Sequence, residues 1–87
     1  MLKAIQKGRG WPDLFIAKPM GKYAGLFLEL KPEGTRIQKK DGSAATPHIT
    51  EQIECLSQLL FNGYCTSFAC GFDNAKLIID DYLNSKL

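Results

Sequence analysis

Glycine and proline residues divide this chain of 87 residues into short segments, and this division most limits what the chain can fold into. Pro32 ends the apolar run GLFLELK, and Gly63 follows the longest stretch with a helical pattern. No apolar run approaches the ~20 residues that a membrane span needs. The chain is therefore expected to form one small domain, residues 1–87, from several short elements.

Two apolar runs in the first half of the chain predict strands over residues 14–17 and 25–31. The connection between them contains Pro19 and Gly21, which is typical of a hairpin. Residues 33–49 are polar and predict a long loop, and long loops in small domains are often functional or disordered.

The second half predicts a helix followed by a third strand. Thr50 can cap a helix that runs to residue 62 and is closed by Gly63, while Thr46 with Pro47 offers an alternative start one turn earlier. The third strand is expected over residues 64–69.

A final helix is expected after Asp73, which can cap it, and a short helical stub is expected at residues 2–7. The resulting order, (α)ββαβα, predicts an α/β fold in which helices flank a mixed sheet. The apolar residues of the final helix follow helical spacing: Ala75, Ile78, Ile79, Tyr82 and Leu83.

The cysteines give no sign of a disulfide or zinc site. Cys55, Cys65 and Cys70 are odd in number, have no C-x-x-C spacing and lie among apolar residues, so we expect small buried side chains in a reducing compartment. His48 is the single histidine. The N-terminus does not read as a secretory signal, and a cytoplasmic location is expected.

Charge is distributed unevenly along the chain. Residues 1–40 hold nine Lys/Arg against three acids, a balance of +6, and residues 41–87 hold two against six, a balance of −4. Such a basic half can meet a polyanion, although ordinary solvated surfaces also show this asymmetry. The side chains expected to contact a DNA backbone are Arg9, Lys18, Lys22, Arg36, Lys39 and Lys40.

The run GLFLELK places charged side chains together. Side chains alternate across a strand, so Phe27, Glu29 and Lys31 share one face, next to the strand end at Pro32. If the first two strands pair as a hairpin, Asp13 lies near this end. The opposite face is expected to be core and carries Leu26, Leu28 and Leu30.

Two neighbouring carboxylates repel unless they share a cation, and hard oxygen ligands suit Mg²⁺ or Mn²⁺. A lysine beside them can position or deprotonate a water. Gln52 falls on the apolar face of its helix and needs a partner, either loop backbone or the cluster of Asp13, Glu29 and Lys31. The alternative without a metal site is that Glu29 and Lys31 face solvent on an edge strand, and that Asp13 starts an ordinary turn.

The sequence GWPDLFIA, then GLFLELK, then EQIECLSQLLFNGY resembles the VRR-NUC domain, the virus-type replication-repair nuclease branch of the PD-(D/E)xK superfamily. The resemblance implies a restriction-endonuclease-like core, a divalent metal and phosphodiester hydrolysis. It also implies that Asp13, Glu29 and the carbonyl of Leu30 are metal ligands, and that Lys31 and Gln52 complete the catalytic set.

Related proteins include stand-alone phage enzymes that act on branched DNA such as four-way (Holliday) junctions. The expected function is therefore a structure-selective DNA endonuclease, with a homodimer making two symmetric cuts. The family's first helix usually carries a glutamate, whereas residues 1–7 contain no acid. This departure keeps open a DNA-binding module that does not cut, or, as a third possibility, a small dimeric interaction protein.

Overall fold

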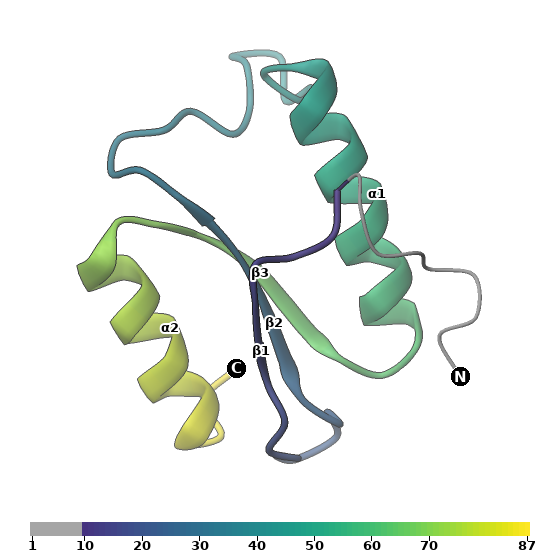
Figure 1. Ribbon diagram of the computed structural model, residues 1–87, viewed down its shortest axis with the longest axis vertical. Helices are drawn as coiled ribbons and strands as arrows, with labels where there is room; N and C mark the ends of the chain where they lie inside the picture. Colours follow the sequence, from purple (N-terminus) through teal and green to yellow (C-terminus); the bar gives the residue numbers. More distant parts are fainter. Residues whose placement is uncertain (1–9) are drawn as a thin grey trace.

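A three-stranded sheet lies between two helices, with α1 on one face and α2 on the other (Figure 1). The computed structural model describes residues 10–87, so the expected stub at residues 2–7 lies outside the described part. The predicted α/β class and the order ββαβα are confirmed. The elements are β1 (Leu14–Ile16), β2 (Leu26–Lys31), α1 (Pro47–Phe61), β3 (Cys65–Cys70) and α2 (Phe72–Leu83).

The sheet is mixed, with the order β1-β2-β3. The strand β1 pairs antiparallel with β2, placing Leu14 opposite Leu28, and β3 pairs parallel with β2, placing Cys70 opposite Lys31. A parallel pair needs a crossover, which α1 supplies. The central strand β2 is thus covered on both faces, and this explains its nearly continuous apolar sequence.

Each face of β2 contributes to a separate apolar cluster. On the α1 side, Phe27 packs with residues of the helix, and on the α2 side two leucines pack around Tyr82. The α1 cluster consists of Phe27, Cys55, Leu56 and Leu59. The α2 cluster consists of Leu26, Leu28, Cys65, Ala69 and Tyr82.

The prediction that Leu30 belongs to the core is wrong, because its side chain is 43% exposed. It lies beside the first turn of α2, where Ala75 is too small to cover it and Phe72 is itself 79% exposed. Leu30 instead lines an open apolar groove of about 330 Å³ between the end of the sheet and α2.

Capping residues define both ends of the helix α1. It begins at the alternative start, with Pro47 as its first residue and the Thr46 hydroxyl accepting a hydrogen bond from the Ile49 N–H at 3.1 Å. The cap predicted at Thr50 is therefore wrong. At the other end Gly63 has φ +97° and its N–H donates to the Leu60 carbonyl, which closes the helix as predicted.

The helix α2 follows β3 after one residue, Gly71, which is its N-cap and offers no side chain. The predicted cap Asp73 is wrong because the helix has already begun there, so its charge lies in the first turn. The Asn74 amide oxygen instead accepts from the N–H of Cys70 at 2.8 Å. At the far end the buried Tyr82 hydroxyl donates to the carbonyl of Lys18 at 2.6 Å.

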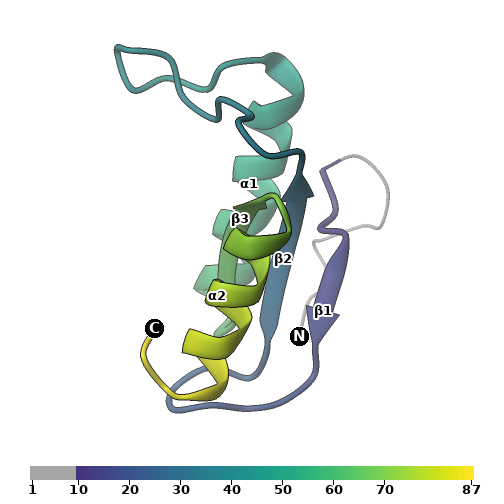
Figure 2. The ribbon, with the colours of Figure 1, turned by 90° about the vertical axis from the view of Figure 1, so that its left-hand side faces the viewer.

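The long loop predicted over residues 33–49 is present but ends earlier, spanning residues 32–46, because α1 begins at Pro47. It folds back on itself as a small hairpin, in which the N–H of Ala45 donates to Ile37 and that of Lys39 donates to Ser43. Figure 2 shows this loop extending past the end of the sheet, above the last residues of β2. Neither helix in residues 10–87 has the length and apolar character to cross a membrane.

Candidate active site

Asp13 is fixed to the end of β2 by two hydrogen bonds. Its backbone N–H donates to the carbonyl of Leu28 at 3.1 Å, and its carboxylate Oδ2 accepts from the N–H of Leu30 at 2.9 Å. The carboxylate thus accepts a hydrogen bond from β2 at a position before β1 begins, where β1 has no strand residue to pair with β2. The hairpin brings Asp13 beside the Glu29–Lys31 end of β2, as the sequence predicted.

Glu29 on β2 and Gln52 on α1 are both buried polar residues, and Glu29 shares the face of β2 whose Phe27 packs against α1. Their side chains are only 4% and 3% exposed, so the predicted inward direction of Gln52 is confirmed. Within residues 10–87, neither the Oε1 of Glu29 nor that of Gln52 has a hydrogen-bond partner. A buried polar atom without a partner costs about 1–3 kcal/mol, so two together indicate a place prepared for a ligand.

The carboxyl of Glu29 has an unusual protonation state in the metal-free protein. Burial, a hydrogen bond with Asp13 and the negative charge of Asp13 raise its pKa from 4.5 to about 8, and the charge of Lys31 offsets only part of this rise. The raised pKa favours the protonated form of Glu29 at neutral pH. A divalent cation can replace that proton, because it supplies the positive charge that both groups lack.

The backbone around Lys31 directs a further oxygen toward this site. The carbonyl of Lys31 accepts from the N–H of Gly71 and thus faces β3. Because backbone groups alternate along a strand, the carbonyl of Leu30 points to the other side, where Asp13 lies. The side chain of Lys31 is half-buried and projects from the same strand face as Glu29.

The oxygen atoms gathered here fit a hard divalent cation. Carboxylates from Asp13 and Glu29, the Gln52 amide oxygen and the Leu30 carbonyl are the donor types that Mg²⁺ and Mn²⁺ prefer. Residues 10–87 contain no cluster of three or more His, Cys, Asp or Glu able to bind a metal ion. A cation at this position would therefore rely on neutral oxygens and water for the rest of its coordination, as Mg²⁺ commonly does.

Two neighbours of the site were not assigned to it from the sequence. The indole ring of Trp11 packs edge-on against the ring of Phe27, with 5.8 Å between the ring centroids. Phe27 precedes Glu29 by two residues and lies on the same face of β2. The buried thiol of Cys55 lies near Glu29, and burial, followed by the charge of Glu29, raises its pKa. No local pattern marks either residue, because both contacts depend on packing between distant segments.

The basic residues predicted to contact DNA fall into two groups. Lys18 and Lys22 lie in the β1–β2 connection, at the opposite end of the sheet from Lys31, so the six residues of β2, about 20 Å, separate them from the site. Arg9 lies outside the described residues. The group at the site end is exposed on the loop of residues 32–46: Arg36, Lys39 and Lys40.

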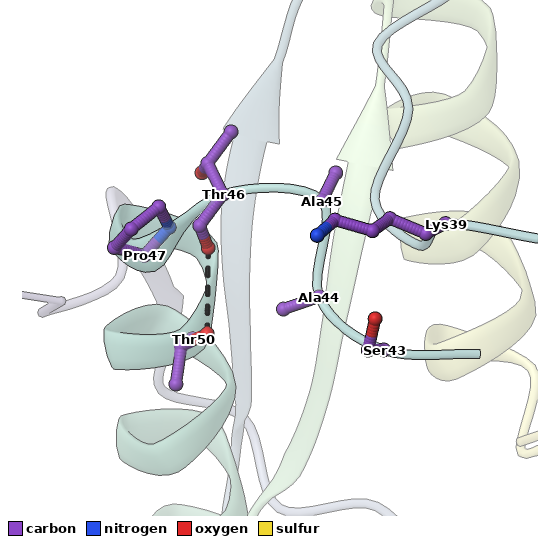
Figure 3. Close-up of a pocket in the computed structure, with 7 residues that line it drawn as sticks. All are labelled: Lys39, Ser43, Ala44, Ala45, Thr46, Pro47 and Thr50. Carbon is purple, nitrogen blue, oxygen red and sulfur yellow. Dashed lines mark hydrogen bonds between the residues drawn. The ribbon is translucent and has the colours of Figure 1, made fainter. Parts of the chain in front are cut away.

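The loop and the start of α1 enclose an open hollow of about 410 Å³. In Figure 3 the side chain of Lys39 extends from the loop across this hollow toward Thr46, next to the first turn of the helix. Hydroxyl groups of Ser43, Thr46 and Thr50 line the same space. The surface next to the acidic site is therefore cationic and polar, which is the chemistry that meets a phosphate backbone.

Two carboxyl groups, a lysine and a buried amide at the end of a mixed sheet define a compact α/β core of the nuclease type. A solved structure described as a VRR_NUC domain protein confirms this class. It has a TM-score of 0.68 and 37% sequence identity over 86% of this chain. This likeness confirms the resemblance to the VRR-NUC domain that the sequence motifs predicted.

The chain spans about half of that related protein, 53% of its length. No family model matches the sequence, and no curated protein matches it.

Proposed function

We propose that this chain is a divalent-metal-dependent endonuclease of the PD-(D/E)xK type that hydrolyses phosphodiester bonds in DNA. The observation that carries the proposal is the pair of buried oxygens on Glu29 and Gln52 that have no hydrogen-bond partner within residues 10–87, with Asp13 and Lys31 both close enough to Glu29 to act on its charge. Buried polar atoms in stable folds nearly always have hydrogen-bond partners, so two without one in the described part of the chain call for an explanation. A bound cation or its water gives both atoms a partner.

Each residue has a distinct role in this scheme. Asp13, Glu29 and the Leu30 carbonyl would hold Mg²⁺ or Mn²⁺, which when bound would offset phosphate charge and lower the pKa of a water. The Nζ of Lys31 orients the attacking water and helps to remove its proton. The Gln52 amide holds that water or the neighbouring phosphate in line. The products are a 5′-phosphate and a 3′-hydroxyl.

The proposed substrate is branched DNA, such as a four-way junction. The exposed cations at the site end lie on a loop, where they contact backbone phosphates without reading base edges. The match with a VRR_NUC domain protein supports a substrate in replication or repair, where branched DNA arises. Selection by DNA shape follows from this arrangement.

A homodimer is the proposed assembly. In the described sheet, β1 and β3 each have one edge that no other strand covers. Resolving a junction needs two symmetric cuts, and two copies provide one site for each. Sedimentation equilibrium at micromolar concentration is expected to give twice the 9.7 kDa chain mass, and a pure monomer would contradict this assembly.

The decisive test of the activity is cleavage of a labelled four-way junction beside linear duplex and single strands, with Mg²⁺, Mn²⁺ or EDTA. Wild type is expected to make paired, symmetric nicks in the junction with either metal and none in EDTA. Lys31→Ala is expected to lower the rate by at least about 100-fold, since it removes a group that acts on the attacking water.

Lys22→Ala is the matched control, because it removes the same charge at the far end of the sheet. It is expected to cut at close to the wild-type rate. Equal rates for wild type and Lys31→Ala would refute the assignment of Lys31. Equal cutting of all DNA forms would refute the selectivity.

A second function remains a specific alternative: a module that binds branched DNA without cutting it. It is favoured by the absence of a third metal-binding acid near Asp13 and Glu29 in residues 10–87. Tight junction binding, with no nick in Mg²⁺ or Mn²⁺, would establish this alternative.

A further inference from the structure

The start of the described chain lies directly on the backbone of α1. Figure 1 shows this segment beside α1 before it crosses to β1. A Cβ atom on Gly10 would lie 2.7 Å from the carbonyl oxygen of Glu51 and 3.3 Å from the backbone nitrogen of Gln52. Gly10 is buried and has φ +76°, a conformation that residues with side chains rarely adopt. Glycine is therefore required here for two independent reasons.

The three residues after Gly10 form a short connection from α1 to β2. Pro12 is buried and has a fixed φ, and the Trp11 ring packs against Phe27 of β2. Asp13 then bonds to β2 through both its backbone and its carboxylate. Three residues span at most about 10 Å, so this connection has little freedom to change length.

We infer that Gly10 is a positioning residue, which sets the distance between Gln52 on α1 and the carboxyl groups of Asp13 and Glu29. The inference rests on the proposed function, because the spacing matters for a cation and a water held between these groups. Gly10 touches α1 at the peptide group that joins Glu51 to Gln52, the residue whose amide oxygen has no partner within residues 10–87. It touches none of the reacting atoms itself.

The size of the effect follows from the contact distance. Ordinary van der Waals contact begins at 3.4 Å, so relieving a 2.7 Å contact moves α1 or the Gly10 segment by about 0.7 Å, the difference between the two. A displacement of about 1 Å at a catalytic group can lower a rate about 100-fold. Metal affinity falls as well, because the oxygen donors separate.

The test compares Gly10→Ala with Gly21→Ala. Gly21 also has a positive φ, +57°, but no atom lies within 4 Å of its added Cβ, and it lies in the β1–β2 connection at the other end of the sheet. Both variants therefore have backbone strain, and only one presses on α1. Gly10→Asn and Gly21→Asn repeat the comparison with a residue that tolerates positive φ better. Thermal unfolding in EDTA first identifies the folded variants.

Titration calorimetry with Mn²⁺ on DNA-free protein and single-turnover junction cleavage provide the readouts. Gly10→Ala is expected to bind Mn²⁺ at least about 10-fold more weakly and to cut about 10- to 100-fold more slowly, with its half-saturating DNA concentration within about 2-fold of wild type. Gly21→Ala is expected to match wild type in all three. Equal Mn²⁺ affinity and equal rates for the two variants would overturn the inference.

The metal-free protein separates this inference from the proposed function. If wild type itself gives no Mn²⁺ heat and no nicks, the proposed function fails. The NMR signals of the Gln52 side-chain amide and the Trp11 indole then decide the inference alone. Gly10→Ala is expected to shift both signals and Gly21→Ala neither. Unchanged signals in Gly10→Ala would show that the contact does not position Gln52.

Discussion

At the scale of single residues, Glu29 has an environment that opposes its own charge. It is buried between β2 and α1, one of its oxygens has no partner in residues 10–87, and Asp13 approaches it from the neighbouring segment. The protein without metal holds this group in its protonated form. Burying this group beside Asp13 therefore lowers the stability of the fold, a cost that a cation would offset in the proposed scheme.

The pH dependence of stability tests this environment. The pKa of Glu29 is about 8 in the folded protein against an ordinary 4.5, so between these values the folded state binds more protons than the unfolded state. The free energy of unfolding in EDTA is then expected to fall as pH rises from 5 to 8, because stability falls with pH wherever the folded state binds more protons. The fall should exceed about 1 kcal/mol, since each pKa unit corresponds to about 1.4 kcal/mol.

Urea unfolding at a series of pH values measures this dependence. Glu29→Gln is expected to remove most of the fall, because an amide does not titrate, and the exposed Glu33→Gln should retain it. Saturating Mn²⁺ should also reduce it in wild type. If Glu29→Gln and wild type show the same slope, Glu29 is not the group responsible.

Gln52 provides a second prediction at this scale. Gln52→Leu replaces a buried amide whose oxygen has no partner with an apolar side chain of similar size. The free energy of unfolding in EDTA is expected to rise by about 1 kcal/mol, while junction cleavage falls at least about 10-fold. Gln58→Leu, exposed on the same helix, should change neither. A loss of stability in Gln52→Leu would show that the amide is satisfied in the metal-free fold.

At the scale of elements, α1 connects the candidate active site to the rest of the sheet. It supplies Gln52 from its second turn, it crosses between two parallel strands, and its start borders the hollow below Lys39. Its N-terminus is capped by the Thr46 hydroxyl, which accepts a hydrogen bond from the Ile49 N–H. The stability of this first turn therefore affects both the fold and the site.

Removing the cap tests its contribution. Thr46→Ala is expected to lower the free energy of unfolding by about 1 kcal/mol, the usual effect of losing an N-cap side chain. Thr50→Ala removes an exposed hydroxyl that makes only a 3.4 Å bond to the Thr46 carbonyl, so its effect should be smaller. Urea unfolding of both variants measures the difference. A larger effect of Thr50→Ala would support the helix start that the structure contradicts.

At the scale of the whole molecule, the two ends of the sheet differ in character. The site end carries the acidic cluster and the basic loop of residues 32–46, while the other end carries the β1–β2 connection and the end of α2 (Figure 2). Lys22 at that far end lies 5.4 Å from the centre of the Tyr23 ring, a cation–π contact within the fold. DNA that reaches the active site is thus expected to follow the loop.

The salt dependence of DNA binding tests this arrangement. A triple variant with Ala in place of Arg36, Lys39 and Lys40 is expected to bind junction DNA more weakly whatever the base sequence of the DNA. The slope of log affinity against log salt should decrease in magnitude by about 2–3, since each phosphate contact contributes about 0.9. The double variant with Ala at Lys18 and Lys22 should keep the wild-type slope. A smaller slope in the double variant, with the wild-type slope in the triple variant, would place the DNA at the far end of the sheet.

Much of the fold and site could be predicted because the signals are local. Alternation along one strand places Glu29 and Lys31 on one face whatever surrounds them, and a hairpin connection brings Asp13 to them. Helical spacing likewise directs Gln52 toward the sheet. Element order, mixed pairing and the Gly63 helix end follow from the same short-range rules, and the structure confirms each of them.

Packing between distant segments decided the rest. The sequence could not show that α2 leaves Leu30 uncovered, or that β3 runs into α2 at Gly71 before the expected cap. It could not show that Gly10 touches α1, or that Lys22 lies far from the site. Local sequence determined which residues share a face of an element. Only the tertiary structure determined which of them are buried, paired or close, because burial and contact depend on what packs across from them.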